Sequence, residues 1–312
     1  MQVHTKKRIL VFDTDMGTDD ALAYAIMANT VQEEVYILTS FGNVSEIQAC
    51  TNARILNHLK GMDWKVFRGS ASPISGEPKY AHDVHGADGL GGATYDISEI
   101  TFKSSGKDRS IHDLAARLSE YDNVDISWLS TGPATNLAFL CEYYRDIFAA
   151  LDQITLMSGS FFDFGNVTSS AEFNAFCDPD SLMQVLRSGK ELTFVPLDVC
   201  RKLPFRYDEL DEAFSVLPME LMRLLRKAHY EYAKTYKKSD GFFGCYPHDS
   251  IAFLACKFPE IFYCVEGVAE CDIDGEVAGQ TRVVTRVGGP HKIAMGVDIR
   301  AARGKISYLG KE

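Results

Sequence analysis

The sequence has 312 residues, of which 46% are hydrophobic, and its 43 acidic side chains outnumber its 32 lysines and arginines, giving a formal net charge of −11. Because such a surface repels phosphate, the charge balance argues against nucleic acid or an anionic membrane as a partner. No apolar run approaches the ~20 residues of a membrane span. The N-terminal residues lack the apolar core of a signal peptide, and the eight cysteines contain no C-x-x-C pair. These features predict a cytoplasmic protein with reduced, mostly buried thiols.

Apolar runs of strand length alternate with longer helical patterns through the first two thirds of the chain. The predicted strands cover residues 8–12, 35–39, 65–67, 124–129, 153–157 and 192–195. Their hydrophobicity is nearly continuous, which indicates strands buried on both faces of a parallel sheet. Helical patterns lie between them at 20–28, 46–59, 111–120, 136–144 and 179–187. The alternation predicts an α/β fold of the doubly wound, Rossmann-related kind, with helices flanking a mostly parallel central sheet.

The last third has a different pattern. Residues 208–236 are helical in character, 250–257 form a short helix, and 262–272 and 281–299 are rich in strand-forming residues. No linker rich in Pro, Gly or Ser separates this part from the rest. We therefore expect one domain over residues 1–312, with a C-terminal helical insertion and a small β-appendage.

Polar residues follow the predicted strands at their carboxyl ends, where open parallel sheets bind ligands. The first strand leads into four aspartates within eight residues, Asp13, Asp15, Asp19 and Asp20. Four carboxylates so close together repel one another unless a cation or shared protons offset them. Capping of the next helix would explain Asp19 and Asp20, but it would not explain Asp13 and Asp15 at the end of a buried strand. Oxygen ligands without Cys or His favour Ca²⁺ or Mg²⁺.

Two other segments carry candidate functional residues. Far downstream, His248 and Asp249 precede an apolar helix, so they offer a titratable acid and a further carboxylate, although Asp249 is equally well explained as a helix cap. The loop at 85–92 (HGADGLGG) is rich in glycine. It lacks the strand-to-helix context of a phosphate-binding turn, and we interpret it as a wall of the site.

The motifs resemble the inosine-uridine preferring nucleoside hydrolase family. DTDMGTDDALA at 13–23 is similar to the family's D-x-D-x-G-x-D-D signature, and five further blocks follow in the family's order. These blocks are GNV at 42–44, HGADGLGG at 85–92, STGPATNLA at 130–138, GNVTSSAEFN at 165–174 and PHD at 247–249. The resemblance covers nearly the whole chain. It implies hydrolysis of the N-glycosidic bond of ribonucleosides and assembly as a homodimer or homotetramer.

The resemblance also implies a role for each matching residue. One Ca²⁺ would be bound by Asp15, Asp20, the main-chain carbonyl of Thr131 and Asp249. Asp15 would be the general base on the attacking water, which Asn43 would help to hold. The ribose would be contacted by Asp19, Asn166, Glu172, Asn174 and Met157. Asp13 would support the metal site from behind, and His248 would assist departure of the base.

Two departures from the family pattern are visible. The stretch at 157–166 is slightly longer than the family pattern. The ribose contact that the resemblance implies for Met157 therefore depends on how this longer stretch is arranged. Met16 replaces a proline that is frequent in the signature, and we expect little effect because this side chain is not needed for ligation.

The base-binding side is less determined. A histidine in the PHD block is typical of family members that prefer inosine and uridine or pyrimidine nucleosides. Both tryptophans, Trp64 and Trp128, lie in or beside predicted strands, which argues against a tryptophan pair that stacks on purines. Tyr232 and Tyr236 lie one helical turn apart and are predicted to form a base-side wall or proton relay, with ordinary helix packing as the alternative.

Two other functions fit parts of the sequence. A haloacid-dehalogenase-like phosphatase also begins with a strand and a D-x-D motif and would use Asp13 as its nucleophile, but it leaves the blocks at 172–174 and 247–249 without a role. A non-catalytic ribose- or nucleoside-binding protein would keep the pocket without turnover. The proposed base Asp15 and the proposed acid His248 are both present, so nothing in the sequence indicates that loss.

Overall fold

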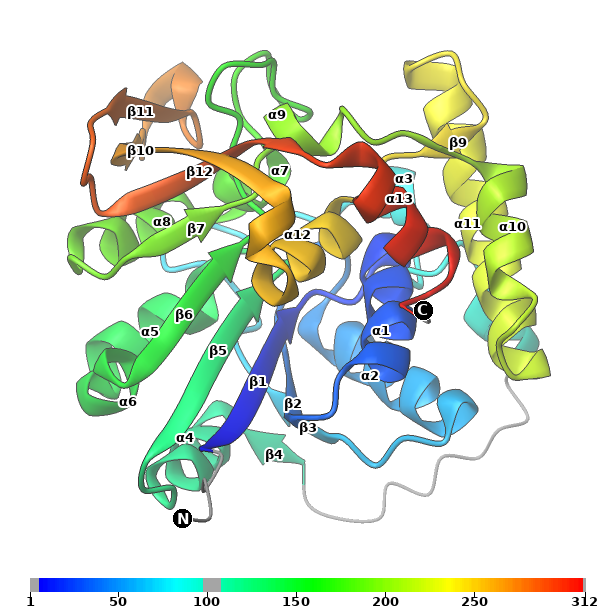
Figure 1. The fold of residues 1–312 in the computed structure, drawn as a ribbon, viewed down its shortest axis with the longest axis horizontal. Coiled ribbons are helices and arrows are strands. Elements are labelled where there is room, and N and C mark those ends of the chain that lie inside the picture. The colour runs from blue at the N-terminus through cyan, green and yellow to red at the C-terminus, as the bar shows by residue number, and fades with distance from the viewer. Residues whose placement is uncertain (1–5, 98–107, 311–312) are drawn as a thin grey trace.

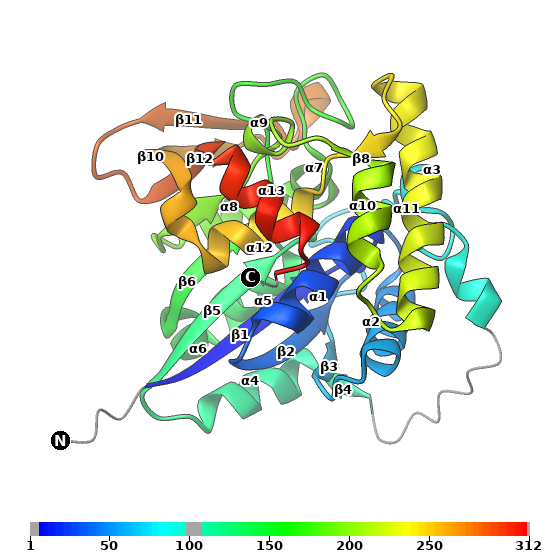
Figure 2. The same cartoon turned by 45° about the vertical axis from the view of Figure 1, so that its right-hand side comes forward.

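A sheet of ten strands runs through the computed structural model, which describes residues 6–97 and 108–310 (Figures 1 and 2). The strands are β1 Lys7–Thr14, β2 Glu34–Thr39, β3 Lys65–Arg68, β4 Arg109–Ser110, β5 Val124–Ser130, β6 Leu151–Leu156, β7 Leu192–Phe194, β10 Phe262–Cys271, β11 Thr281–Thr285 and β12 His291–Val297. Their order across the sheet is β11-β10-β12-β7-β6-β5-β1-β2-β3-β4. Two short strands, β8 Phe205–Arg206 and β9 Gly244–Cys245, form a separate antiparallel pair.

All neighbouring pairs from β12 to β4 are parallel, whereas β10 is antiparallel to both β11 and β12. The predicted mostly parallel sheet is therefore confirmed. The strand-rich tail is part of this same sheet, because β12 pairs with β7 through His291 and Leu192. The expected β-appendage is thus the antiparallel edge of the central sheet.

Helices cover both faces of the sheet (Figure 1). Their bounds are α1 Thr18–Thr30, α2 Glu46–Lys60, α3 His82–His85, α4 Ile111–Ser119, α5 Thr135–Tyr143, α6 Arg145–Ala149, α7 Phe173–Cys177, α8 Pro179–Arg187, α9 Leu197–Cys200, α10 Tyr207–Phe214, α11 Met219–Ser239, α12 His248–Lys257 and α13 Ile299–Ser307. Alternate residues of β1 enter two cores. Leu10 and Phe12 pack with α1, α2, α11 and α12, and Ile9 and Val11 pack with α4, α5 and α8. Each fully buried aliphatic side chain contributes about 1.5–3 kcal/mol.

The predicted helix at 208–236 is two helices. α10 ends at Phe214, and α11 begins at Met219 after Pro218. Proline lacks the backbone N–H that would continue the first helix, and it disfavours helical geometry in the residue before it. The break turns the chain back, so that α11 lies against α10 and reaches the loops above the sheet (Figure 2).

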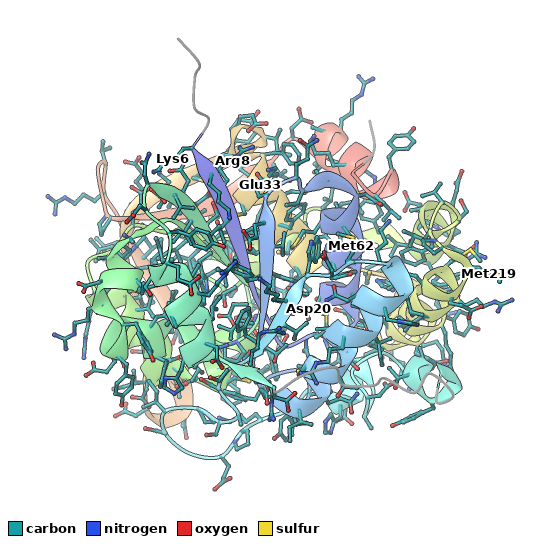
Figure 3. The ribbon with its side chains drawn as sticks, turned by 90° about the horizontal axis from the view of Figure 1, so that it is seen from below. Lys6, Arg8, Asp20, Glu33, Met62 and Met219 are labelled. Atoms are coloured by element: carbon teal, nitrogen blue, oxygen red, sulfur yellow. The ribbon has the colours of Figure 1, made fainter. Side chains whose placement is uncertain are left out.

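The two ends of the strands differ in character. At the amino end of β1, Lys6 and Arg8 are exposed and Glu33 is partly buried, all three away from the buried Asp20 (Figure 3). Arg8 and Glu33 form an ion pair of 3.6 Å there. The carboxyl ends of β1, β2, β5 and β6 carry most of the candidate residues. Among the described residues, no helix has the length and apolar character needed to cross a membrane.

Candidate functional site

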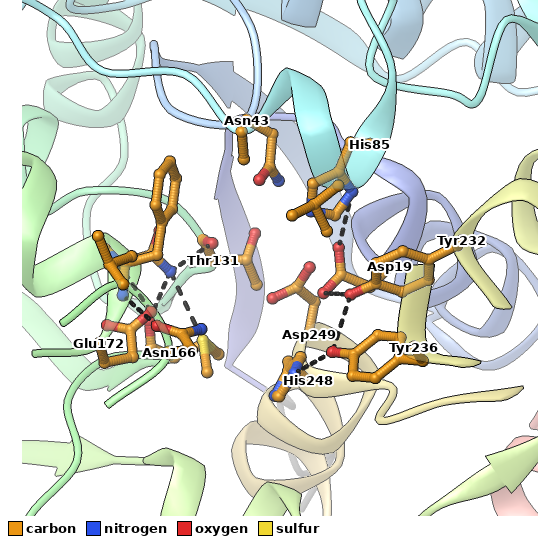
Figure 4. Close-up of a pocket in the computed structure, with 16 residues that line it drawn as sticks. Asp19, Asn43, His85, Thr131, Asn166, Glu172, Tyr232, Tyr236, His248 and Asp249 are labelled. Atoms are coloured by element: carbon orange, nitrogen blue, oxygen red, sulfur yellow. Dashed lines mark hydrogen bonds and ion pairs between the residues drawn. The ribbon is translucent and has the colours of Figure 1, made fainter. Parts of the chain in front are cut away.

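A cavity of about 110 Å³ opens at the carboxyl ends of the central strands (Figure 4). Of the candidate residues, those that line it are Asp19, Asn43, Thr131, Met157, Asn166, Glu172, Asn174, Tyr232, Tyr236, His248 and Asp249. Asp15 and Asp20 are fully buried beside it and contact the lining residue Asn43. The structure thus brings together side chains that are spread over more than two hundred residues of sequence.

One wall of the cavity, which we name the carboxylate wall, consists of the turn at 13–20 together with Asp249. Asp20 accepts hydrogen bonds from the hydroxyls of Thr14 and Thr131, each at 2.6 Å. Its second oxygen accepts from the backbone N–H of Gly17 at 2.7 Å. These contacts tie the end of β1, the start of α1 and the end of β5 to a single carboxylate.

Asp15 is held from the other side by Asn43. It accepts from the backbone N–H of Asn43 at 2.7 Å and from its side-chain Nδ2 at 2.9 Å. A Cβ atom at Gly42 would lie 2.0 Å from Asp15 Oδ2, so only glycine allows the loop after β2 to approach this closely. The 42–44 block therefore needs Gly42 for this close approach and Asn43 for the hydrogen bonds to Asp15.

The backbone of the turn is unusual at Met16. Its φ angle is 39°, in the left-handed region. A proline ring fixes φ near −65° and could not adopt this conformation. The expectation that replacing the frequent proline by Met16 has little effect on ligation stays a prediction.

Three carboxylates of the wall are placed to share a cation. Asp19, Asp20 and Asp249 each offer an oxygen, and these oxygens lie within 4.8 Å of one another. Burial raises the pKa of Asp19 to about 6 and raises the pKa of Asp249 well above its ordinary value, with repulsion from Asp19 as the next cause for Asp249. Asp19 Oδ1 is buried and has no hydrogen-bond partner among the described residues. A hard divalent cation would relieve both the repulsion and the missing contact.

Two of the metal ligands that the resemblance implies, Asp20 and Asp249, belong to this cluster. Asp19 stands with Asp20 and Asp249 in the cluster, whereas both oxygens of Asp15 are engaged by Asn43. The carbonyl oxygen of Thr131 accepts from Asn174 Nδ2 at 2.9 Å, which leaves it a second lone pair. Asp15 is nevertheless electrostatically part of the cluster, because Asp20 is the second cause, after burial, that raises the pKa of Asp15.

Asp13, at the start of the carboxylate wall, does not line the cavity. It accepts from Asn136 Nδ2 at 2.7 Å and from the Ser130 hydroxyl at 3.2 Å. Burial raises the pKa of Asp13 to about 7. A fully buried carboxylate that is held in this way cannot reach a phosphoryl group, which argues against the phosphatase interpretation.

The opposite wall is the loop at 157–174, between β6 and α7, which we name the sugar loop (Figure 4). Glu172 accepts from the backbone N–H groups of Gly159 at 2.9 Å and Asn174 at 2.8 Å, and burial raises the pKa of Glu172 to about 7. Asn174 Nδ2 donates to the carbonyls of Thr131 and Met157, each at 2.9 Å. The loop thus presents a carboxylate and amides across from the carboxylate wall.

Helix α11 and the start of α12 supply a third side. The Tyr236 hydroxyl lies 3.0 Å from His248 Nε2 and 3.4 Å from the Tyr232 hydroxyl, which in turn donates to Asp19 over 3.4 Å. Burial lowers the pKa of His248 to about 3, so this ring is neutral. Its Nδ1 is buried without a partner among the described residues. The two tyrosines therefore connect the carboxylate wall to His248, as the relay prediction requires.

Some lining residues were missing from the sequence-based candidates. His85 lines the cavity, and its ring centroid lies 5.0 Å from that of Tyr232. Its Nδ1 accepts from the backbone N–H of Thr18 at 3.1 Å, and burial lowers the pKa of His85 to about 4. The histidine at the head of the glycine-rich block was the available signal. Apolar contacts from Ala81, Val84, Val167 and Phe173 complete the lining and had no signal of their own.

A second cavity of about 310 Å³ adjoins the first, and the two share Val84, Asn166, Tyr236 and His248. Arg201 and Tyr246 line the second cavity but not the first. Trp128 is fully buried in β5 and Trp64 packs against Tyr24, so neither tryptophan lines either cavity. This placement of Trp64 and Trp128 is consistent with the expectation that they do not stack on a purine base.

The chain has clear relatives among known proteins. The model of the inosine-uridine preferring nucleoside hydrolase family matches residues 10–303. Uridine nucleosidase 1 of Arabidopsis thaliana is 32% identical over 285 residues, which cover 88% of this chain and 82% of that protein. Non-specific ribonucleoside hydrolase RihC of Escherichia coli is 30% identical over 299 residues, which cover 94% of each. The solved structure of the plant nucleoside hydrolase PpNRh1 matches with a TM-score of 0.84 and 25% identity, over 99% of this chain and 100% of that one.

Proposed function

Because the chain belongs to the inosine-uridine preferring nucleoside hydrolase family and is an N-ribosyl hydrolase of ribonucleosides, we propose that it works with Ca²⁺ and prefers either inosine and uridine or pyrimidine nucleosides. One observation carries the metal proposal: Asp19, Asp20 and Asp249 converge within 4.8 Å in a buried site, with one oxygen of Asp19 lacking a hydrogen-bond partner among the described residues. Hard oxygen donors without nitrogen or sulfur suit Ca²⁺.

The ion would be held by Asp15, Asp20, Asp249 and the carbonyl of Thr131, with Asp19 beside them facing the sugar. When bound, it would lower the pKa of a water molecule and orient the ribose hydroxyls. Asp15 would take the proton of the attacking water, and the two bonds from Asn43 fix the orientation of that carboxylate.

Cleavage of an N-glycosidic bond develops positive charge on the sugar and negative charge on the departing base. Glu172, Asn166 and Asn174 on the sugar loop would hold the ribose, and the buried carboxylate would stabilise the developing positive charge. These side chains are fixed before substrate arrives, because Glu172 and Asn174 are already hydrogen-bonded to backbone groups. With the base Asp15 on one side and the leaving group on the other, we expect inversion at the anomeric carbon, by analogy with glycosidases.

The departing base would be assisted by His248. If Nε2 accepts from the Tyr236 hydroxyl, Nδ1 carries the proton of the neutral ring, and it is this Nδ1 that has no partner in the described part of the chain. A donor of this kind can satisfy an oxygen or nitrogen of a purine or pyrimidine. The names of relatives support the preference, since they include uridine nucleosidases and a pyrimidine-specific ribonucleoside hydrolase.

The test measures ribose release from uridine, cytidine, inosine and adenosine, with and without EGTA. We expect EGTA to abolish release and added Ca²⁺ to restore it, with adenosine the poorest substrate. Undiminished release in EGTA would contradict the metal proposal, and a clear preference for adenosine would contradict the base preference.

The resemblance to the family also supports a cytoplasmic homodimer or homotetramer built from one domain. Sedimentation equilibrium of the purified protein would give the mass of two or four chains. A monomer at micromolar concentration would contradict this assembly.

A further inference from the structure

The tip of the sugar loop is not held in place by apolar burial, although Met157, Phe161 and Ala171 nearer its ends pack against the core or are buried. Phe162 is 61% exposed and Phe164 is 75% exposed, so the two aromatic side chains near its tip contribute little to its stability. The loop nevertheless carries Asn166 and Glu172, whose positions must be correct to within a fraction of an ångström if they are to hold the sugar. Hydrogen bonds within the loop, such as those from the Ser160 hydroxyl to the carbonyls of Asp163 and Phe164, fix part of its backbone. Further hydrogen bonds come from outside the loop, from Asp198 and Arg201.

Asp198, on the short helix α9, fixes the first half. This carboxylate is 5% exposed, and its two oxygens accept from consecutive backbone N–H groups, those of Phe161 at 2.9 Å and Phe162 at 2.7 Å. The preceding residue, Leu197, donates its own N–H to the carbonyl of Gly159 at 3.0 Å. Hydrogen bonds to a charged acceptor are about twice as strong as those between neutral groups.

Arg201, three residues further along, fixes the second half. Its guanidinium donates to the carbonyl of Phe164 at 2.6 Å and to the carbonyl of Gly165 at 3.0 Å. It also pairs with Asp163 at 3.1 Å. The planar fork of arginine can hold two adjacent carbonyls at once, which the single ammonium of lysine cannot do in the same geometry.

The next residue after these two carbonyls is Asn166. Its Oδ1 accepts from the backbone N–H of Phe173 at 2.9 Å, and its side chain lines both cavities. Any shift of the Phe164 and Gly165 carbonyls would therefore move Asn166 directly. Arg201 also lines the second cavity and does not line the first.

We propose that Asp198 and Arg201 are positioning residues, which hold the sugar loop so that Asn166 and Glu172 meet the ribose. The proposal rests on the proposed function for the identity of the bound group. It assigns to Arg201 an action through Asn166 and no contact of its own with the nucleoside.

The first test compares Arg201→Met, Arg201→Lys and Asp198→Asn with wild type on uridine. We expect kcat/KM of Arg201→Met to fall about tenfold, mainly through KM, with partial recovery in Arg201→Lys. The matched control is Lys202→Met, which removes the neighbouring cationic side chain but whose contact is with the carbonyl of Met295 on β12. A control that loses as much as Arg201→Met, or an Arg201→Met within twofold of wild type, would overturn the proposal.

A double-mutant cycle with Asn166→Ala separates positioning from direct contact. If Arg201 acts through Asn166, Arg201→Met should cost less than about twofold in the Asn166→Ala background. If the full tenfold loss persists, or if its size differs between uridine and inosine, Arg201 contacts the base directly and the positioning role is wrong.

Hydrogen exchange gives a readout that does not depend on turnover. In Asp198→Asn and Arg201→Met, the amides of Phe161 and Phe162 should exchange at least about tenfold faster than in wild type, while Lys202→Met leaves them unchanged. Unchanged protection of these amides in both Asp198→Asn and Arg201→Met would refute the positioning role. If the two variants exchange faster as expected but the wild type hydrolyses no nucleoside, the proposed function fails while the positioning role of Asp198 and Arg201 stands.

Discussion

The two walls of the cavity reach their shapes by different means. In the carboxylate wall, Asp15 and Asp20 sit where regular elements end, and their partners come from the ends of β1, β2 and β5. In the sugar loop, no helix or strand contains residues 158–170, and the holding contacts from outside the loop come from Asp198 of α9, from Arg201 just after it and from β11. The ends of the sheet strands position the carboxylate wall, whereas the sugar loop also depends on hydrogen bonds from segments that are distant in the sequence. Substitutions should therefore affect chemistry on the first wall and mainly binding on the second.

The largest effect is expected for Asp15→Asn. It removes the proposed base, and we expect kcat to fall by about a thousandfold or more. Because it also removes one of several mutually repelling buried carboxylates, the protein in EGTA should unfold at a higher temperature than wild type. Kinetics and thermal unfolding measure the two effects, and Asp125→Asn at the exposed amino end of β5 is the control. A kcat of Asp15→Asn near that of wild type would show that Asp15 is not the general base.

His248→Ala comes next, and it tests the side between the walls. Inosine and uridine need assistance at the departing base, so their kcat/KM should fall about a hundredfold. A nitrophenyl riboside carries a leaving group that needs no proton, and it should lose no more than about threefold. Equal losses on both substrates would show that His248 shapes the pocket without aiding departure.

Thr281→Val tests how far the sugar loop depends on distant contacts. The Thr281 hydroxyl accepts from the N–H of Ser160 at 2.9 Å and donates to its carbonyl at 3.0 Å. Valine leaves both backbone groups buried and unpaired, which should lower the free energy of unfolding by about 2 kcal/mol and raise KM a few-fold. Thr285→Val, on the exposed end of the same strand, is the control for chemical denaturation and kinetics. A change in kcat with KM unchanged would contradict the assignment of this wall to binding.

The smallest effect concerns the helix that closes the carboxylate wall. His229 of α11 is buried against Phe214, and burial lowers its pKa to about 4 from 6.5. As pH falls from 6.5 towards 4, the unfolded chain binds a proton that the folded chain does not, so stability is lost in that window and is fully present above it. Between pH 7 and pH 5 we expect His229→Phe to lose about 2 kcal/mol less than wild type.

Urea unfolding at pH 7 and pH 5 measures this difference. The exposed His82 provides the control substitution, His82→Phe, which should keep the acid sensitivity of wild type. An identical loss in wild type and His229→Phe would mean that His229 is not the group that titrates.

Much of the fold was readable in the sequence. The six strands that were predicted in the first two thirds all exist, because their continuous hydrophobicity is required when both faces of a sheet are covered. Five short motifs after the signature were enough to predict the family, which the comparisons confirm. The break between α10 and α11 was missed, although Pro218 marked it, because the apolar period continues on both sides.

The sequence by itself determined which chemical groups are present: the aspartate turn after a buried strand, the amides and carboxylate of the 165–174 block, and the histidine of the PHD block. Tertiary structure alone decided how they meet. It placed Asp19 rather than Asp15 with Asp20 and Asp249, brought His85 into the cavity, and joined β12 to β7. It also set α9 against the sugar loop. The physical reason is that local pattern records which face of an element is buried, whereas hydrogen bonds between distant segments depend on how the elements pack.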